Sequence, residues 1–148
     1  MNKKRESREF CFQYFFHLQL PIFSEEKNAT DENSIKKSIQ EFQESTNTLL
    51  GDEFNTYVFK QIKNTMVNYT SIETIIEKYL KNWKLNRISR VDHTTLLLAV
   101  NELCFDKDTP VGIVINEAIE ISKKFGSEES ASFVNGILDN IAKNELNE

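Results

Sequence analysis

Glycine and proline, the residues that most often interrupt helices, are scarce in this chain. Its 148 residues include four glycines and two prolines. The segments between these breaks are long, and most of them repeat apolar residues every three or four positions, which is the spacing of one face of an α-helix. The sequence therefore predicts an all-α fold.

Cysteine is as scarce as proline, and the two cysteines are far apart. Cys11 and Cys104 each lie in an apolar stretch, which is the setting of a small buried side chain. A chain of this length buries roughly 68–70% of its unfolded surface on folding, so it needs no disulfide bonds to be stable. We therefore expect no disulfide framework and a reducing compartment.

Long apolar runs are also missing. A membrane-spanning helix needs about 20 consecutive apolar residues, and no segment approaches that length. Near the N-terminus, basic residues precede an apolar stretch as they do in a signal peptide. However, polar side chains such as Gln13, His17 and Gln19 interrupt the stretch, and no small-residue cleavage site follows. The sequence predicts a cytoplasmic protein that does not bind a membrane.

Motifs for catalysis and metal binding are absent from the sequence. The chain has no phosphate-binding loop, no dinucleotide fingerprint, no HExxH and no paired CxxC. His17 and His93 stand alone on different expected helices, with no nucleophile at a recognisable spacing. Glu117 and Glu120 fit a solvated or ion-paired helix face better than a catalytic carboxylate pair. We predict that the protein is not an enzyme and holds no metal or cofactor.

The charge is acidic overall but unevenly distributed. A net charge of −5 argues against a protein that coats nucleic acid non-specifically, since neutralising phosphates needs concentrated cations. Basic residues nevertheless gather in two places: residues 1–9 hold four of them, and residues 78–90 hold five with no acid. Charge alone leaves two interpretations open, namely RNA binding and ordinary solvated cations around a helix junction.

Seven helical segments follow from the apolar spacing. Pro21 ends the first and Gly51 the second, and a capping box of Thr70 and Glu73 opens the fourth. The fifth is apolar on most sides, so we expect it to be the buried central helix of the C-terminal half. The expected segments cover, in order, residues 4–20, 35–49, 52–66, 70–83, 89–105, 110–125 and 127–141, each to within a few positions.

These segments suggest one domain made of two helical bundles, an N-terminal part over residues 1–85 and a C-terminal part over residues 86–148. Gly126 should end the sixth helix in a left-handed cap. Gly136 lies inside the last helix, where glycine costs about 1 kcal/mol relative to alanine. We therefore expect a neighbouring helix to approach it closely.

The C-terminal third carries short motifs in a specific order and spacing, and matching segments occur in the central and first helices. Together they resemble the NusB family over about half of the chain, whereas residues 21–80 match it only in helical character. The motifs are Asp108-Thr109-Pro110, Val114 to Glu120 (VINEAIE), Lys124-Phe125-Gly126, Ser130 and Phe133 to Asp139 (FVNGILD), with Val91-Asp92, Leu96, Leu98-Ala99 and Glu102-Leu103 in the central helix and Arg8-Glu9, Gln13 and Gln19-Leu20 in the first.

The resemblance implies a fold of two three-helix bundles with an extra helix, in agreement with the seven segments. It also implies pairing with NusE, a small-subunit ribosomal protein, and recognition by the pair of single-stranded boxA RNA in nascent transcripts, chiefly those of ribosomal RNA operons. Other Nus elongation factors and RNA polymerase would take part indirectly. The implied function is that of a transcription antitermination factor.

By the same resemblance, the RNA-contacting side chains come from the basic N-terminus, the first helix and the last two helices. Cations would hold phosphates, and an exposed ring can stack on an unpaired base for roughly 1–3 kcal/mol. For Phe125 and Phe133, packing in the hydrophobic core is as strong an interpretation as contact with RNA. Asp92 falls where the family presents an acid to NusE, and its competing role is the helix cap with Ser89. The positions implied for RNA are Lys3, Lys4, Arg5, Arg8, Phe16, Phe125, Glu129 and Phe133.

Several positions depart from the family pattern. Val111 and Gly112 stand where the family has an aromatic residue and a lysine, Leu97 replaces an arginine, and Asn101 replaces a tyrosine. These departures keep open an alternative, a NusB-fold interaction module or homodimer with weak or lost RNA recognition. An accessory domain of an RNA methyltransferase is less expected, because the sequence ends at Glu148 with no catalytic domain.

Overall fold

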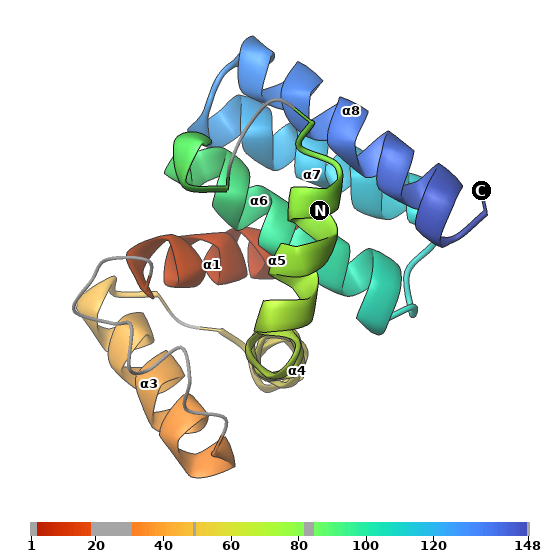
Figure 1. Ribbon diagram of the computed structural model, residues 1–148. Coiled ribbons are helices and arrows are strands. Elements are labelled where there is room, and N and C mark those ends of the chain that lie inside the picture. The colour runs from red at the N-terminus through yellow and green to blue at the C-terminus, as the bar shows by residue number, and fades with distance from the viewer. Residues whose placement is uncertain (1–2, 19–30, 49, 82–84, 148) are drawn as a thin grey trace. The chain divides into compact units, whose positions relative to one another are not determined.

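The computed structural model describes residues 3–18, 31–48, 50–81 and 85–147, and the chain divides into two compact units, 1–67 and 68–148. Seven α-helices and no strand occur in the described ranges (Figure 1), which confirms the prediction of an all-α fold with seven helices. No helix within those ranges combines the length and apolar character that a membrane span requires.

The first unit consists of α1 (Lys3–Leu18), α3 (Glu32–Ser45) and α4 (Asp52–Val67). α4 packs against both of the other helices. Aromatic side chains join α1 to α3, because the Phe42 ring meets the rings of Phe10 and Tyr14 edge-on, with centres 5.4 and 5.6 Å apart. The Tyr14 hydroxyl lies 2.8 Å from Ser38 Oγ, so its polar end is also partnered. Further buried core residues are Phe12, Phe15, Ile35, Ile39, Val58, Ile62 and Met66.

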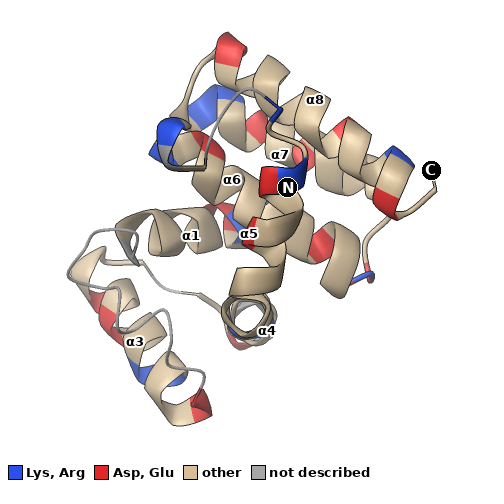
Figure 2. Ribbon diagram, in the orientation of Figure 1, with Lys and Arg blue, Asp and Glu red and all other residues tan. Residues whose placement is uncertain are grey.

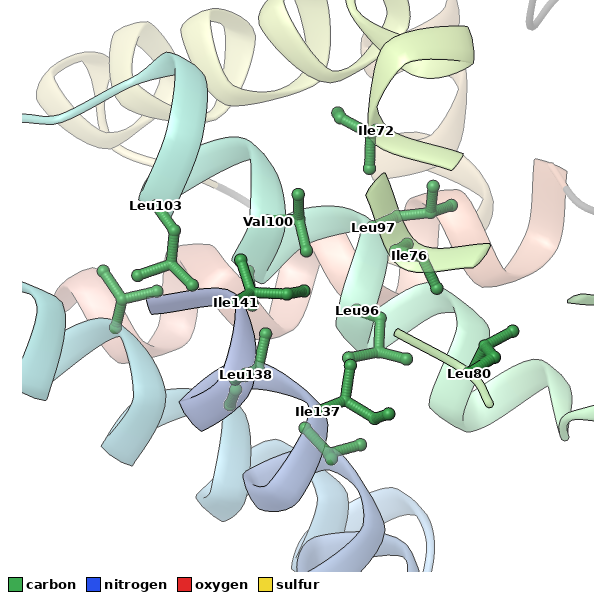
Figure 3. Close-up of a cluster of buried hydrophobic side chains, with 14 residues drawn as sticks. Ile72, Ile76, Leu80, Leu96, Leu97, Val100, Leu103, Ile137, Leu138 and Ile141 are labelled. Atoms are coloured by element: carbon green, nitrogen blue, oxygen red, sulfur yellow. The ribbon is translucent and has the colours of Figure 1, made fainter. Parts of the chain in front are cut away.

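The second unit consists of α5 (Tyr69–Lys78), α6 (Arg90–Val100), α7 (Val111–Phe125) and α8 (Glu128–Glu145). A short 3-10 turn (Leu85–Arg87) precedes α6. Every residue of α6 from Thr94 onward is buried, and its side chains lie among those of the other three helices (Figure 3). The predicted buried central helix is therefore confirmed. The labelled core residues are Ile72, Ile76, Leu80, Leu96, Leu97, Val100, Leu103, Ile137, Leu138 and Ile141.

A π-helical turn (Asn101–Phe105) continues α6. The Asp106 backbone N–H donates to the Asn101 carbonyl at 2.8 Å, which closes the wider loop of an i to i+5 bond. Asn101 and Glu102 are both buried in this turn. Apolar periodicity alone does not reveal such a turn, because it inserts a residue without breaking the helix.

Two helix ends differ from those that the sequence predicts. α3 ends at Ser45 rather than at Gly51, because Thr46 Oγ1 bonds to the Phe42 carbonyl at 2.8 Å and Asn47 takes a left-handed φ of 53°. α5 starts at Tyr69, with Asn68 preceding it and making no side-chain cap bond. The capping box expected at Thr70 is therefore wrong, because Thr70 already lies inside the helix.

The boundary between the two units also lies earlier in the chain than the division expected near residue 85. α5 packs against α6, and its Ile72 and Ile76 belong to the core of the second unit. The unit therefore begins at Asn68. α5 ends at Lys78, Lys81 has a φ of 48°, Arg87 lies in the 3-10 turn and Arg90 begins α6, so these four basic residues do not share one helix.

Two glycines behave differently from their predicted roles. Gly126 does end α7, but its φ is −122°, so the expected left-handed cap is wrong. Its lack of a side chain matters for space, since a Cβ there would lie 2.8 Å from both the Ser122 carbonyl oxygen and Ser130 Oγ. A Cβ on Gly136 would meet nothing within 4 Å. The close helix approach expected at Gly136 is therefore wrong.

Candidate nucleic-acid interface

The basic residues at the start of α1 are organised around one aromatic ring. Lys3 begins the helix, and its side chain lies outside the described part of the structure. Lys4 and Arg8 are one helical turn apart, and both reach over the Tyr57 ring of α4, with Lys4 Nζ 5.5 Å and Arg8 Cζ 5.9 Å from its centre. Tyr57 thus holds two cations through cation–π contacts.

The two arginines at the start of α1 differ in their exposure to solvent. Arg5 is exposed, in agreement with its predicted role, whereas Arg8 is only 7% exposed. RNA binding by these cations predicts that both arginines are exposed, and this prediction is wrong for Arg8. A long side chain that lies along an aromatic ring loses contact with water even when it remains charged. A phosphate would find Arg5 directly but would reach Arg8 only beside the Tyr57 ring.

Phe16 lies near the end of α1 and is half-buried. Its ring stacks on that of Phe12, with centres 5.7 Å apart and planes 21° apart. Phe12 itself is 2% exposed, so it anchors Phe16 to the core of the first unit. A ring that is fixed on one side and partly exposed on the other suits stacking on a base, because little further ordering is needed.

The remaining positions predicted to contact RNA lie in the second unit, at the corner between α7 and α8. Phe125 is the last residue of α7 and is half-buried, with Lys124 Nζ 5.6 Å from its ring centre. Glu129 is exposed in the first turn of α8, and Phe133, one turn later, packs half-buried against the core. For both phenylalanines the structure combines partial core packing with partial exposure.

Basic residues also flank this corner. Lys123 and Lys124 occupy the last turn of α7, and Arg90 begins α6. Figure 2 shows Lys and Arg in the last turn of α7 and at the start of α6. The charge at this corner is therefore mixed, because these cations lie near Glu128 and Glu129 in the first turn of α8.

Asp92 lies in the first turn of α6 and is 9% exposed. The helix cap is Ser89, whose Oγ accepts from the Asp92 backbone N–H at 3.1 Å. Burial raises the pKa of the Asp92 carboxyl, while hydrogen bonds from Ser130 and Ser89 oppose the rise. Its Oδ1 is buried with no hydrogen-bond partner among the described residues. Burial of this oxygen destabilises the isolated chain, because the oxygen loses its hydrogen bonds to water and gains no protein donor.

Sequence reasoning missed Tyr57, which lies on α4 and has no motif around it. Its contacts with α1 depend on how the two helices pack, and residue spacing does not reveal them. Of the two carboxylates interpreted as a solvated or ion-paired helix face, Glu120 is exposed, whereas Glu117 is only 7% exposed, so the solvated alternative does not hold for Glu117. His93 is half-buried, and its Nε2 lies 2.9 Å from Glu73 Oε2.

Comparison with known proteins decides the family. A sequence model of the NusB family matches residues 5–143. The chain belongs to the NusB family. The match covers both units, including α3 and α4, where the resemblance by motif was weak.

Individual relatives agree with this assignment. The transcription antitermination protein NusB of Acetivibrio thermocellus is 34% identical over 143 residues, which cover 97% of this chain and 90% of that protein. NusB of Clostridium tetani is 34% identical, and the alignment covers 95% of this chain and 98% of that protein. Family membership makes this chain a transcription antitermination protein, and it confirms the prediction that the chain is not an enzyme.

Solved structures show the same fold. The T. maritima NusB structure has a TM-score of 0.78 and 35% identity, covering 95% of this chain and 90% of that one. A crystal structure of the antitermination factors NusB and NusE in complex with dsRNA contains a similar chain, with a TM-score of 0.77 and 26% identity over 95% of this chain and 96% of that one.

Proposed function

We propose that this protein binds boxA RNA in nascent transcripts, chiefly those of ribosomal RNA operons, together with NusE. The observation that carries the proposal is the similarity of this chain to one in a NusB–NusE–dsRNA crystal structure. Further Nus factors and RNA polymerase would join indirectly. Because a factor of this kind acts where transcripts are made, we place its action in the cytoplasm.

Each unit would contribute its own contacts to the RNA. In the first, the cations of α1 would hold phosphates, with two of them restrained by the Tyr57 ring. Phe16 would stack on an unpaired base. In the second, Phe125 and Phe133 would stack, and the exposed Glu129 carboxylate could accept a hydrogen bond from the amino group of a base. Lys3 and Arg5 complete the proposed set of cations.

Asp92 is our proposed contact for NusE. A buried carboxylate with one unpartnered oxygen is costly in the free protein. A cationic group of the partner would supply the missing charge and the missing donor, so the cost would be recovered on binding. This role is compatible with the Ser89 cap, which uses the backbone N–H of Asp92 and leaves Oδ1 without a partner.

Fluorescence anisotropy with a labelled boxA-like RNA and a scrambled RNA, each with and without NusE, tests the proposal. Wild type should prefer the boxA-like RNA, and NusE should strengthen that preference. Arg5→Ala should weaken binding several-fold and reduce the salt dependence by about one phosphate contact. Arg5 is the better probe, because removing the buried Arg8 also disturbs packing.

Lys37→Ala is the matched control, since Lys37 is an exposed cation on α3 that we do not assign to RNA. This variant should bind as wild type does. Equal and negligible binding of both RNAs, even with NusE present, would overturn the proposal. The chain would then be a NusB-fold interaction module, and sedimentation would show whether it forms the homodimer of the alternative hypothesis.

A further inference from the structure

A surface groove lies between the C-terminal end of α5 and the middle of α8. Tyr79, Lys81, Phe133, Gly136 and Asn140 are among its lining residues, and its volume is about 360 Å³. This lies at the small end of the range of roughly 300–1,000 Å³ for ligand sites. The groove therefore has room for one small planar group with its attached chain, and not for a helix of a protein partner.

Gly136 lines this groove and places no side chain in it. A Cβ at this position would meet nothing within 4 Å, although glycine inside a helix costs about 1 kcal/mol relative to alanine. Packing against a neighbouring helix does not explain the residue. Bare backbone in a groove is what close approach of a ligand requires.

The chemistry of the walls suits a nucleotide. Phe133 and Tyr79 are half-buried aromatic residues on two different elements, and each can offer part of its ring to a base. Tyr79 is also fixed in place, since its hydroxyl lies 2.5 Å from Glu145 Oε2. The Ser132 and Asn140 side chains can form hydrogen bonds to base edges.

The charge around the groove favours an anionic ligand. Among the described residues that line the groove, Lys81 is the one cation and none is a carboxylate. Two of the nearby acids are paired, Glu145 with Lys78 at 2.8 Å and Asp139 with Lys143 at 3.4 Å. Lys81 is exposed and lies three residues after α5 in a left-handed conformation. It belongs to the basic segment 78–90, which our proposed RNA contacts leave unused.

We propose that this groove binds one unpaired nucleotide of the RNA, with its base against Phe133 and its phosphate at Lys81. The inference rests on the proposed RNA-binding function and extends it, because Phe133 forms the wall shared by the groove and the RNA-contacting residues of α8. The basic segment 78–90 thereby gains a role through Lys81, and Gly136 is explained by the space that the nucleotide needs.

Gly136→Leu tests the groove by filling it. Leucine is a strong helix former and its Cβ meets no neighbour, so the helix should fold normally while the side chain occupies the nucleotide space. Gly136→Ala is the matched control, since a methyl group is too small to fill the groove. Lys81→Asn removes the cation and keeps a residue that tolerates a left-handed backbone. Lys107→Gln removes an exposed cation elsewhere in the same unit.

Binding of a labelled single-stranded boxA-like RNA, with NusE present, is measured by anisotropy over a range of salt concentrations. Gly136→Leu should weaken binding by about tenfold, the loss expected for one stacked base. Lys81→Asn should weaken it a few-fold and lower the salt dependence by about one phosphate contact. Both control variants should bind as wild type. RNA containing 4-thiouridine should cross-link to the peptide that contains Phe133 and Asn140, and Gly136→Leu should abolish this cross-link.

The results of these binding experiments distinguish failure of the groove inference from failure of the proposed RNA-binding function. If wild type binds boxA-like RNA and Arg5→Ala weakens it, while Gly136→Leu and Lys81→Asn bind normally, the groove inference is overturned and the proposed function stands. If these two variants lose affinity for NusE instead of RNA, the groove is a protein site and the inference is also overturned. Absence of RNA binding by wild type overturns both proposals. Thermal melting followed by circular dichroism confirms that each variant is folded.

Discussion

Arg8 of α1 lies over Tyr57 of α4, with its guanidinium carbon 5.9 Å from the ring centre. Lys4 shares the same ring, so one tyrosine orients two of the cations at the start of the chain. A long basic side chain normally loses rotamer entropy when it grips a phosphate. The ring reduces this loss because it restrains both side chains before RNA arrives.

Tyr57→Leu should therefore weaken RNA binding although it removes no charge. We expect a loss of about two- to fivefold, which corresponds to a cation–π contribution of roughly 0.5–1 kcal/mol at an exposed site. Tyr57→Phe keeps the ring and should bind RNA as wild type does. Anisotropy titrations of the two variants measure the difference. Equal affinity of Tyr57→Leu and wild type would show that the ring does not prepare these cations for RNA.

Asp92→Asn should raise the melting temperature at pH 7 by a few degrees. Burial raises the pKa of this carboxyl in the folded state, so it holds its proton at pH values where the unfolded chain has lost it. Between the ordinary pKa of 3.8 and the raised pKa, stability falls as pH rises. The difference between Asp92→Asn and wild type should vanish as the pH drops below 3.8, because both side chains are then neutral.

The same variant separates stability from partner binding. If Asp92 meets a cationic group of NusE, Asp92→Asn should weaken NusE binding by on the order of tenfold while it stabilises the free protein. Calorimetric titration with NusE measures this, and Glu120→Gln serves as a control because Glu120 is exposed on α7 and outside the proposed contact. Unchanged NusE affinity would assign Asp92 a purely structural role.

Alanine should have opposite effects at two glycines of the second unit. At Gly126 the new Cβ would lie 2.8 Å from the Ser122 backbone oxygen, which cannot rotate away, so we expect destabilisation of about 1–3 kcal/mol. At Gly136 the Cβ enters open space, so alanine should stabilise the helix by roughly 1 kcal/mol. Urea denaturation of both variants checks the prediction. A stabilising Gly126→Ala would mean that the chain turns differently between α7 and α8.

Glu145→Gln should destabilise the protein at neutral pH and have no effect in acid. Hydrogen bonds from Lys78 and Tyr79 lower the pKa of the Glu145 carboxyl. A lowered pKa gives stability that is present above the ordinary value of 4.5 and is lost as the pH falls through the folded-state pKa. Melting curves from pH 7 down to the acid range measure this. Tyr79→Phe removes one of the two bonds and should show a smaller loss; an equal difference at all pH values would contradict the ionic origin.

Much of the fold could be predicted because helix formation leaves a local signal. The 3.6-residue spacing of apolar side chains identified the seven α-helices of the described ranges, and the continuous apolar run of α6 correctly marked the buried centre of the second unit. The Ser89 helix cap could also be predicted, because Ser89 lies only three residues before Asp92, from whose backbone N–H it accepts a hydrogen bond. The helix ends at Thr46 and Asn68 were missed because no glycine marks them: Thr46 bonds through its side chain to the Phe42 carbonyl, and Asn68 makes no side-chain cap bond.

The sequence by itself determined the family and its broad function, because the motifs in α6, α7 and α8 are short, ordered and contiguous. Only the tertiary structure decided which side chains share a site. Tyr57 beneath Lys4 and Arg8 joins two helices that are distant in sequence, and so does the groove above Gly136. Burial of Asp92 likewise depends on the helices packed around it. Such contacts depend on how helices pack against one another, and residue spacing along a single helix carries no information about the neighbour that it meets.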